Sequence, residues 1–103
     1  MAKVVSALEA AALVHDGSAV LLDVRELDEW VAVRAPGALH IPMRQLAVSV
    51  DRLHRDKIIA CICHVGMRSA AVADALTDAG YDAVNVTGGM EAWEAAGLPV
   101  DRG

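Results

Sequence analysis

The 103-residue sequence contains no phenylalanine, and its only Trp and Tyr residues are Trp30, Tyr81 and Trp93. Its hydrophobic fraction of 55% therefore consists mainly of Ala, Val, Leu and Ile. A core of such residues suits parallel strands that are buried on both faces and helices that pack closely against them. One domain over residues 1–103 is predicted, and a domain of this length can bury a stable core without disulfide bonds or a structural metal.

Positive charge is also scarce, because nine Lys and Arg residues stand against fourteen Asp and Glu, a formal net charge of −5. We therefore expect no basic face that binds nucleic acid or an anionic membrane, and an anionic substrate has to be attracted by a local field. No apolar run approaches the roughly 18 residues of a membrane span, and Glu9 interrupts the apolar residues near the N-terminus, so no signal peptide is predicted. A soluble, cytoplasmic protein is expected.

Cysteine is limited to Cys61 and Cys63, two residues apart on one predicted strand. This spacing is too short for a relaxed structural disulfide. Two thiols without a neighbouring cluster of His or Cys also make a poor zinc site, so no metal and no cofactor is predicted. Free thiols in a reducing compartment fit this pattern best.

Short apolar runs alternate with segments of helical periodicity along the whole chain. Strands are predicted at residues 3–5, 19–24, 38–41, 58–62 and 84–86, and helices at residues 6–14, 25–33, 43–53, 67–79 and 90–96. Because strands and helices alternate, the connections should be right-handed crossovers. The predicted fold is a three-layer α/β domain, with a central, mostly parallel sheet of about five strands and helices on both faces.

The stretch of residues 58–69, IIACICHVGMRS, has the layout of a strand that ends in a nucleophile. Its apolar run stops at Cys63, a loop containing Gly66 follows, and Arg68 and Ser69 open a helix. Backbone N–H groups converge at such a loop and the helix dipole favours negative charge, so the thiolate should be stabilised without a metal. Gly66 allows backbone angles that a side chain would forbid.

Four residues separate Cys63 from Arg68, and the stretch CHVGMRS resembles the cysteine loop of the rhodanese (thiosulfate sulfurtransferase) family. Three further stretches carry the same resemblance: LLDVRELDEW, APGALHIPM and GGMEAWEAAGLPV. The four motifs occur in the family's order and cover nearly the whole chain. One departure is Arg34 and Ala35 ahead of Pro36, where many members carry a histidine.

The resemblance implies a rhodanese-like fold and a sulfurtransferase whose nucleophile is Cys63. Cys63 would take a sulfane sulfur from a donor such as thiosulfate and pass it from a persulfide to cyanide, a thiol or a protein acceptor. The donor and the persulfide would be held by Arg25 and by the loop that comprises His64, Val65, Gly66, Met67, Arg68 and Ser69. Two successive displacements predict ping-pong kinetics.

Both arginines near the loop have two interpretations. Arg25 either binds the sulfonate-like oxygens of the donor or forms a structural ion pair with Glu26, Glu29 or another acid. Arg68 either faces the donor or braces the loop through a carboxylate. Asp23, at the end of a buried run, is expected to be a structural acceptor for loop N–H groups or for an arginine.

For the remaining candidates the structural interpretation is favoured over a functional one. Cys61 is expected to be an inert core residue, with a resolving thiol as the alternative. His64 either contacts the substrate or contributes only its backbone N–H. His40 is expected to be a filler, and Trp30 and Trp93 are expected to anchor the core.

Two other classes of function compete with sulfur transfer. A phosphatase or arsenate reductase of the same fold class also uses a thiolate in an anion-binding loop, although the phosphatases have one more residue between Cys and Arg. A binding or regulatory module without catalysis is the other alternative, and such relatives typically lack the cysteine.

Overall fold

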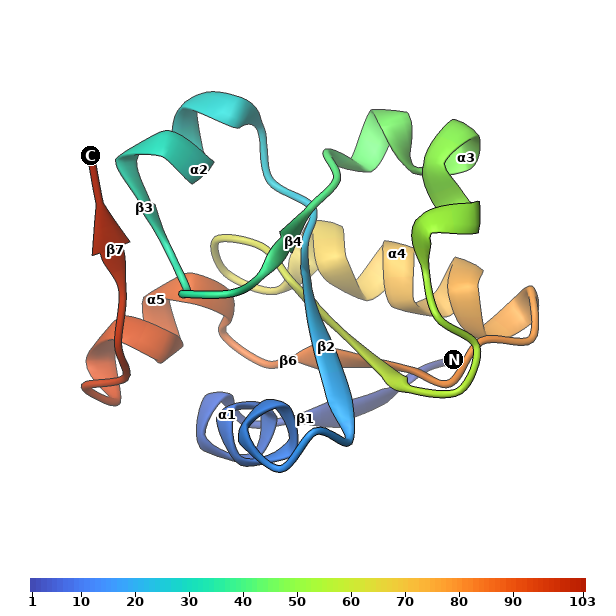
Figure 1. The fold of residues 1–103 in the computed structure, drawn as a ribbon, viewed down its shortest axis with the longest axis horizontal. Coiled ribbons are helices and arrows are strands. Elements are labelled where there is room, and N and C mark those ends of the chain that lie inside the picture. Colours follow the sequence, from blue (N-terminus) through green and yellow to red (C-terminus); the bar gives the residue numbers. More distant parts are fainter.

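The computed structural model describes residues 1–103 and contains a five-stranded sheet in the order β1-β6-β5-β2-β4, with every neighbouring pair parallel. The strands are β1 (Lys3–Val5), β2 (Ala19–Asp23), β4 (Leu39–His40), β5 (Ile58–Ile62) and β6 (Ala83–Val86). In the register, Asp23 on β2 pairs with both Ile62 on β5 and His40 on β4. The carboxyl ends of these three strands therefore meet at one edge of the sheet (Figure 1).

Helices cover both faces of the sheet, which confirms the predicted three-layer α/β fold. One core packs α1 (Ala7–His15) and α5 (Gly89–Ala95) against the sheet, and the other packs α4 (Met67–Asp78) against its opposite face. Side chains alternate between the two cores along β5, so Cys61 and Cys63 belong to the core under α4 while Ile62 belongs to the other. The longest helix, α4, has 12 residues, and no helix has the length and hydropathy to cross a membrane.

Helix α1 begins as the sequence predicts. Ser6 Oγ accepts the Glu9 N–H at 3.0 Å, and the Glu9 carboxylate accepts the Ser6 N–H at 2.8 Å, a reciprocal capping box.

The prediction of one continuous helix over residues 43–53 is wrong. A 3₁₀ turn at Met43–Gln45 leads into the single turn of α3 (Leu46–Ser49), and a second 3₁₀ turn follows at Val50–Arg52. Val48, Ser49 and Val50 have low helix propensity, which weakens a continuous helix here. The helix predicted over residues 25–33 is also shorter, because α2 spans Leu27–Ala32 and begins after Glu26.

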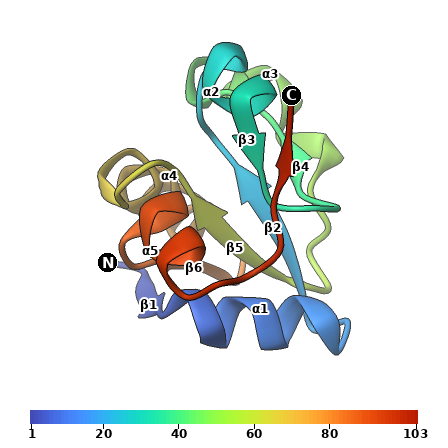
Figure 2. The ribbon, with the colours of Figure 1, turned by 90° about the vertical axis from the view of Figure 1, so that its left-hand side faces the viewer.

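A two-stranded antiparallel ribbon was not predicted. It joins β3 (Val33–Arg34) to β7 (Asp101–Arg102), and Figure 2 shows the two strands side by side. Strands of two residues are too short to show the alternation that identifies a strand in the sequence.

The two tryptophans differ from one another. Trp93 is buried and its indole N–H donates to the carbonyl of Pro99 at 2.8 Å, which confirms it as a core residue. Trp30 is only half-buried, so its prediction as a core anchor is wrong. It stacks on His40 with ring centroids 4.7 Å apart, and His40 Nε2 lies 2.8 Å from the carbonyl oxygen of Arg25. His40 is therefore an ordered part of this edge of the sheet rather than a filler.

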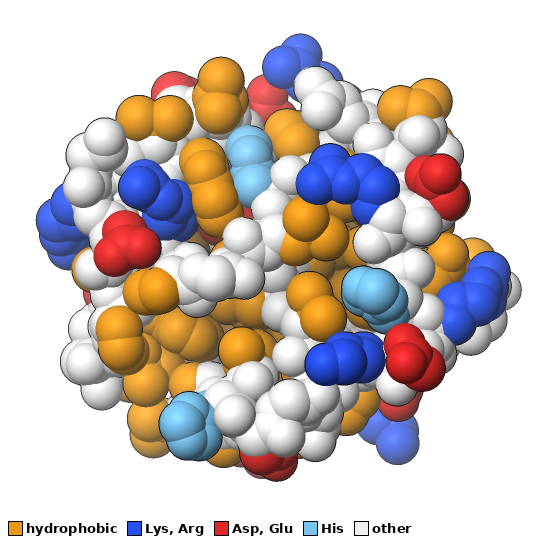
Figure 3. Space-filling view, in the orientation of Figure 1, with side chains coloured by type: hydrophobic (Ala, Val, Ile, Leu, Met, Phe, Trp, Pro, Cys, Tyr) orange, Lys and Arg blue, Asp and Glu red, His pale blue; other side chains and the backbone are white.

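Charged side chains of both signs are interspersed on the face that Figure 3 shows, and the Lys and Arg side chains form no continuous field there.

Candidate active site

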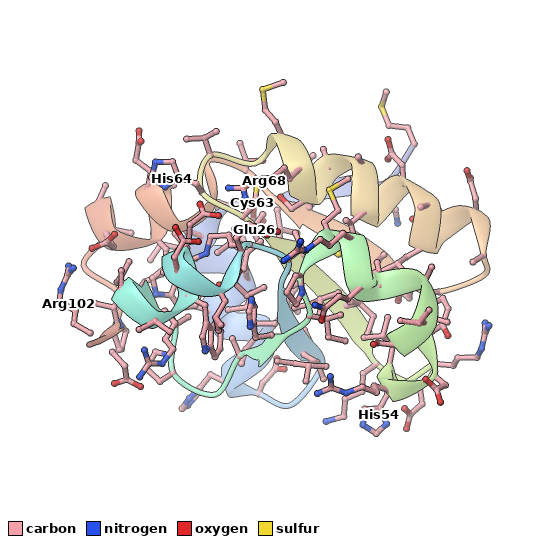
Figure 4. All side chains as sticks on the ribbon, turned by 90° about the horizontal axis from the view of Figure 1, so that it is seen from above. Glu26, His54, Cys63, His64, Arg68 and Arg102 are labelled. Carbon is pink, nitrogen blue, oxygen red and sulfur yellow. The ribbon has the colours of Figure 1, made fainter.

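Cys63 is the first residue after β5, and its sulfur accepts several hydrogen bonds from the loop that follows. The Gly66 N–H donates to Sγ at 3.1 Å, the Ser69 N–H at 3.4 Å and the Ser69 hydroxyl lies 3.2 Å away. Figure 4 shows Cys63 and His64 close to Arg68, which lies in the first turn of α4. The predicted convergence of N–H groups at the cysteine is therefore confirmed.

The pKa of the Cys63 thiol reflects two opposed effects. Burial alone raises this pKa, but the hydrogen bonds from the Ser69 hydroxyl and from the N–H groups of Ser69, Gly66 and Arg68 outweigh it. The net result is a lowered pKa, which increases the thiolate fraction. The neighbouring Cys61 behaves differently, because burial and the nearby Cys63 raise the pKa of its thiol to about 12. Both cysteines are free thiols.

The shape of the loop depends on two glycines. Gly66 precedes the first residue of α4 and has a φ of +103°, a conformation that side chains rarely adopt. Gly89 packs directly under the loop, and a Cβ on it would overlap the carbonyl oxygen of Cys63. That carbonyl accepts the Met90 N–H at 2.8 Å, and the carbonyl of His64 accepts the Glu91 N–H at 3.0 Å. The start of α5 therefore holds the cysteine loop from beneath.

Arg68 braces the loop through a carboxylate, one of the two alternatives that the sequence left open. Its Nη1 and Nη2 donate to the two carboxylate oxygens of Glu29 on α2 at 2.7 and 2.8 Å. This contact lowers the pKa of Glu29 to about 2, against a burial effect of opposite sign. It also raises the pKa of Arg68. The guanidinium is thus engaged by α2 rather than by the sulfur.

Glu29→Gln should change how stability depends on pH. The folded-state pKa of Glu29 is about 2, below its ordinary 4.5, so the ion pair stabilises the fold above pH 4.5 and is lost as pH falls toward 2. The stability difference between wild type and variant should therefore be largest at neutral pH and shrink in acid. Both side chains are partly exposed, so we expect about 1 kcal/mol or less. Thermal unfolding of both proteins at several pH values from neutral to acid measures this stability difference. A difference that does not change with pH would contradict the stabilising role of the Glu29–Arg68 ion pair.

Arg25 forms a buried ion pair with Asp23. The side chains are 2% and 0% exposed, and Nε and Nη2 donate to the carboxylate at 3.0 and 2.8 Å. The other guanidinium contacts are to the carbonyls of Val33 at 2.6 Å and Glu29 at 3.3 Å. Because its donors are used inside the protein, the structure favours the ion-pair alternative, with Asp23 as the acid. Asp23 also accepts the Arg25 N–H at 3.0 Å, as expected for a structural acceptor.

Three side chains close to Cys63 in the sequence are exposed to solvent. Val65 is 47% exposed, Met67 79% and His64 57%, and His64 Nε2 lies 3.7 Å from a carboxylate oxygen of Glu91. The backbone donors to the Cys63 sulfur come instead from Gly66 and Ser69.

Sequence reasoning missed Asn85, the polar residue in the middle of β6. It is buried, its Nδ2 donates to the Gly66 carbonyl at 3.1 Å, and its Oδ1 accepts the Ser69 hydroxyl at 2.6 Å. The available signal was a single amide in the apolar run AVNV, because a buried polar side chain needs a partner.

The sequence and the fold are similar to those of known proteins. Residues 6–96 match the rhodanese-like domain family. The chain is 36% identical to the thiosulfate sulfurtransferase GlpE of Actinobacillus succinogenes, covering 86% of this chain and 81% of that protein. It is 33% identical to the thiosulfate sulfurtransferase GlpE of Coxiella burnetii, with 92% and 90% covered. A rhodanese-related protein from Thermoplasma volcanium has a similar crystal structure, with a TM-score of 0.89, 32% identity and coverage of 96% and 97%.

Proposed function

The chain belongs to the rhodanese-like domain family, and on that premise we propose that it is a thiosulfate sulfurtransferase that carries sulfur as a persulfide on Cys63. The observation that supports this most strongly is the set of hydrogen-bond donors around the Cys63 sulfur, from Gly66 and from the backbone and hydroxyl of Ser69. Donors in this arrangement stabilise a thiolate, which is the attacking form of cysteine.

The proposed reaction has two displacements. The Cys63 thiolate attacks the outer sulfur of thiosulfate, the sulfur–sulfur bond of thiosulfate breaks, and sulfite leaves with the electron pair. The persulfide on Cys63 then carries its negative charge on the outer sulfur. A cyanide or thiolate acceptor attacks that outer sulfur, and the Cys63 thiolate leaves with the electron pair. Neither step needs a proton, a metal or an external oxidant.

Recognition of the anionic donor is assigned to the backbone of residues 64–69 rather than to a free guanidinium. Arg25 is paired with Asp23, and Arg68 is paired with Glu29. Backbone N–H groups at a helix start attract anions without a net positive charge. Small anions and thiols, or a protein that presents a thiol, are the proposed partners, and a cytoplasmic location suits the two free cysteines.

Two observations favour sulfur transfer over the competing functions. In a phosphatase loop the arginine would face the phosphate, whereas the Arg68 guanidinium is held by Glu29 on α2. A binding module without catalysis needs no lowered cysteine pKa, yet hydrogen bonds lower that of Cys63.

Mass spectrometry after exposure to thiosulfate tests the proposal. We expect the protein to gain one sulfur atom on Cys63 and to lose it on addition of cyanide, with release of thiocyanate. An aryl phosphate serves as the comparison substrate. A folded protein that gains no sulfur would favour the binding module, and release of phosphate without sulfite would indicate the phosphatase.

A further inference from the structure

The hydroxyl of Ser69 lies between two acceptors but has one hydrogen to donate. Its Oγ is 3.2 Å from the Cys63 sulfur and 2.6 Å from Asn85 Oδ1. Ser69 is 0% exposed, Cys63 1% and Asn85 8%, so water does not readily replace a missing partner. The two acceptors therefore compete for the same hydrogen.

The orientation of the Asn85 amide is fixed by its other end. Its Nδ2 donates to the carbonyl of Gly66 at 3.1 Å. The reversed orientation would place Oδ1 against that carbonyl oxygen, two acceptors in contact, so Oδ1 faces Ser69. The Gly66 carbonyl also accepts the Ala70 N–H at 3.3 Å, and it keeps this partner if the amide is removed.

We propose that Asn85 is a positioning residue that competes with the Cys63 sulfur for the hydroxyl hydrogen of Ser69. While Cys63 is a thiol, its S–H donates to Ser69 Oγ, and the Ser69 hydroxyl donates to Asn85 Oδ1. When Cys63 is a thiolate, the hydroxyl turns toward Sγ, and Asn85 Oδ1 loses its partner. A buried acceptor without a partner costs free energy. Asn85 thereby favours the neutral thiol and limits how far the loop lowers the cysteine pKa.

This role deepens the proposed function and rests on it, because it concerns the same nucleophile. In the persulfide the negative charge moves to the outer sulfur, and Sγ no longer needs the hydrogen of Ser69. The hydroxyl then returns to Asn85. The strength of a thiolate as a nucleophile falls as its pKa falls, whereas a low pKa makes it a better leaving group. Asn85 thus adjusts the balance between loading and unloading of sulfur.

The charged groups around Cys63 are largely paired, which simplifies the interpretation of its titration. Arg68 pairs with Glu29 and has Glu26 nearby, and His64 lies near Glu91. Asp23 pairs with Arg25, and the remaining titratable group is the thiol of Cys61. Asn85 on β6 carries no charge, so replacing it by an apolar residue leaves this set unchanged.

The test is the pH dependence of the alkylation rate of Cys63 by iodoacetamide, a measurement that needs no sulfur transfer. Asn85→Leu keeps the branching of the side chain and should lower the pKa of Cys63 by about one pH unit, because the thiolate gains an uncontested hydrogen bond. Ser69→Ala should raise it. In the Ser69→Ala background, Asn85→Leu should no longer lower the pKa, since the contested hydrogen is gone. Mass spectrometry confirms that only Cys63 reacts.

A merely structural role for Asn85 gives the opposite sign. Loosening the loop would weaken the N–H donors and raise the pKa of Cys63 equally in both backgrounds, and that result would overturn the proposal. Asn85→Val, which suits a strand, replaces the leucine variant if circular dichroism shows misfolding. A protein that titrates as expected but gains no sulfur from thiosulfate would refute the proposed function and leave this role of Asn85 intact.

Discussion

Cys63→Ser is expected to abolish sulfur transfer from thiosulfate to cyanide while the protein stays folded. A serine hydroxyl is not ionised at neutral pH even among the donors from Gly66 and Ser69, and it forms no persulfide. The loss of rate should be on the order of 10⁴-fold or more, as for other nucleophile deletions. Serine is close in size to cysteine and keeps hydrogen-bonding partners in the loop, so the midpoint of thermal unfolding should shift by less than about 5 °C. Thiocyanate formation and thermal unfolding measure the two effects.

Cys61→Ala is the matched control for this variant. Cys61 lies on the same strand, is completely buried and has a thiol pKa of about 12, so it holds almost no thiolate at neutral pH. The alanine variant should keep most of its sulfur transfer activity and lose some stability through the small cavity. Activity that persists in Cys63→Ser and disappears in Cys61→Ala would assign the nucleophile to Cys61.

The sheet and the position of the cysteine at its edge were predictable because they depend on local patterns. The apolar runs at residues 19–24 and 58–62 each give one buried parallel strand, and the capping box at Ser6 marks the start of α1. The N–H donors at Cys63 follow from a strand, a glycine and a helix start in succession. These features need only a few consecutive residues.

The hydrogen-bonding and ion-pair partners of the site's polar side chains could not be predicted from the sequence. Glu29 and Arg68 are 39 residues apart, and their contact depends on how α2 lies against the first turn of α4. Several acids stand close to Arg25 in the sequence, and Asp23 is the partner because both side chains are buried at the end of β2. Asn85 was missed because the pairing of β6 with β5 brings it under Ser69. In each case, tertiary packing selects one partner among several.

Under the proposed function, the site attracts an anion through backbone dipoles in a protein of formal net charge −5. Arg25 and Arg68 are neutralised by carboxylates, and Arg44 lies 3.3 Å from a carboxylate oxygen of Glu26. Fixed N–H groups act over a short range, so they stabilise charge at the sulfur without a basic surface around it. We therefore expect the local field that attracts an anionic donor to come from the loop itself.

Arg25→Met is expected to lower the free energy of unfolding by about 3–5 kcal/mol, because it leaves the buried carboxylate of Asp23 without its counter-charge. The methionine also fails to donate to the carbonyl of Val33, which Arg25 contacts at 2.6 Å. Urea unfolding measures the loss. At a temperature where the variant is still folded, the KM for thiosulfate should match that of the wild type, since the guanidinium donors are used by Asp23 and by the carbonyls of Val33 and Glu29.

Removing both members of the pair separates the structural role from a substrate role. In the Asp23→Leu/Arg25→Met variant no buried charge is left alone, so part of the stability lost in Arg25→Met should return. If Arg25 instead leaves the pair to bind the sulfonate oxygens of the donor, Arg25→Met would raise the KM for thiosulfate with little loss of stability. The double variant would then share that raised KM, and the interpretation of Arg25 as a structural residue would be wrong.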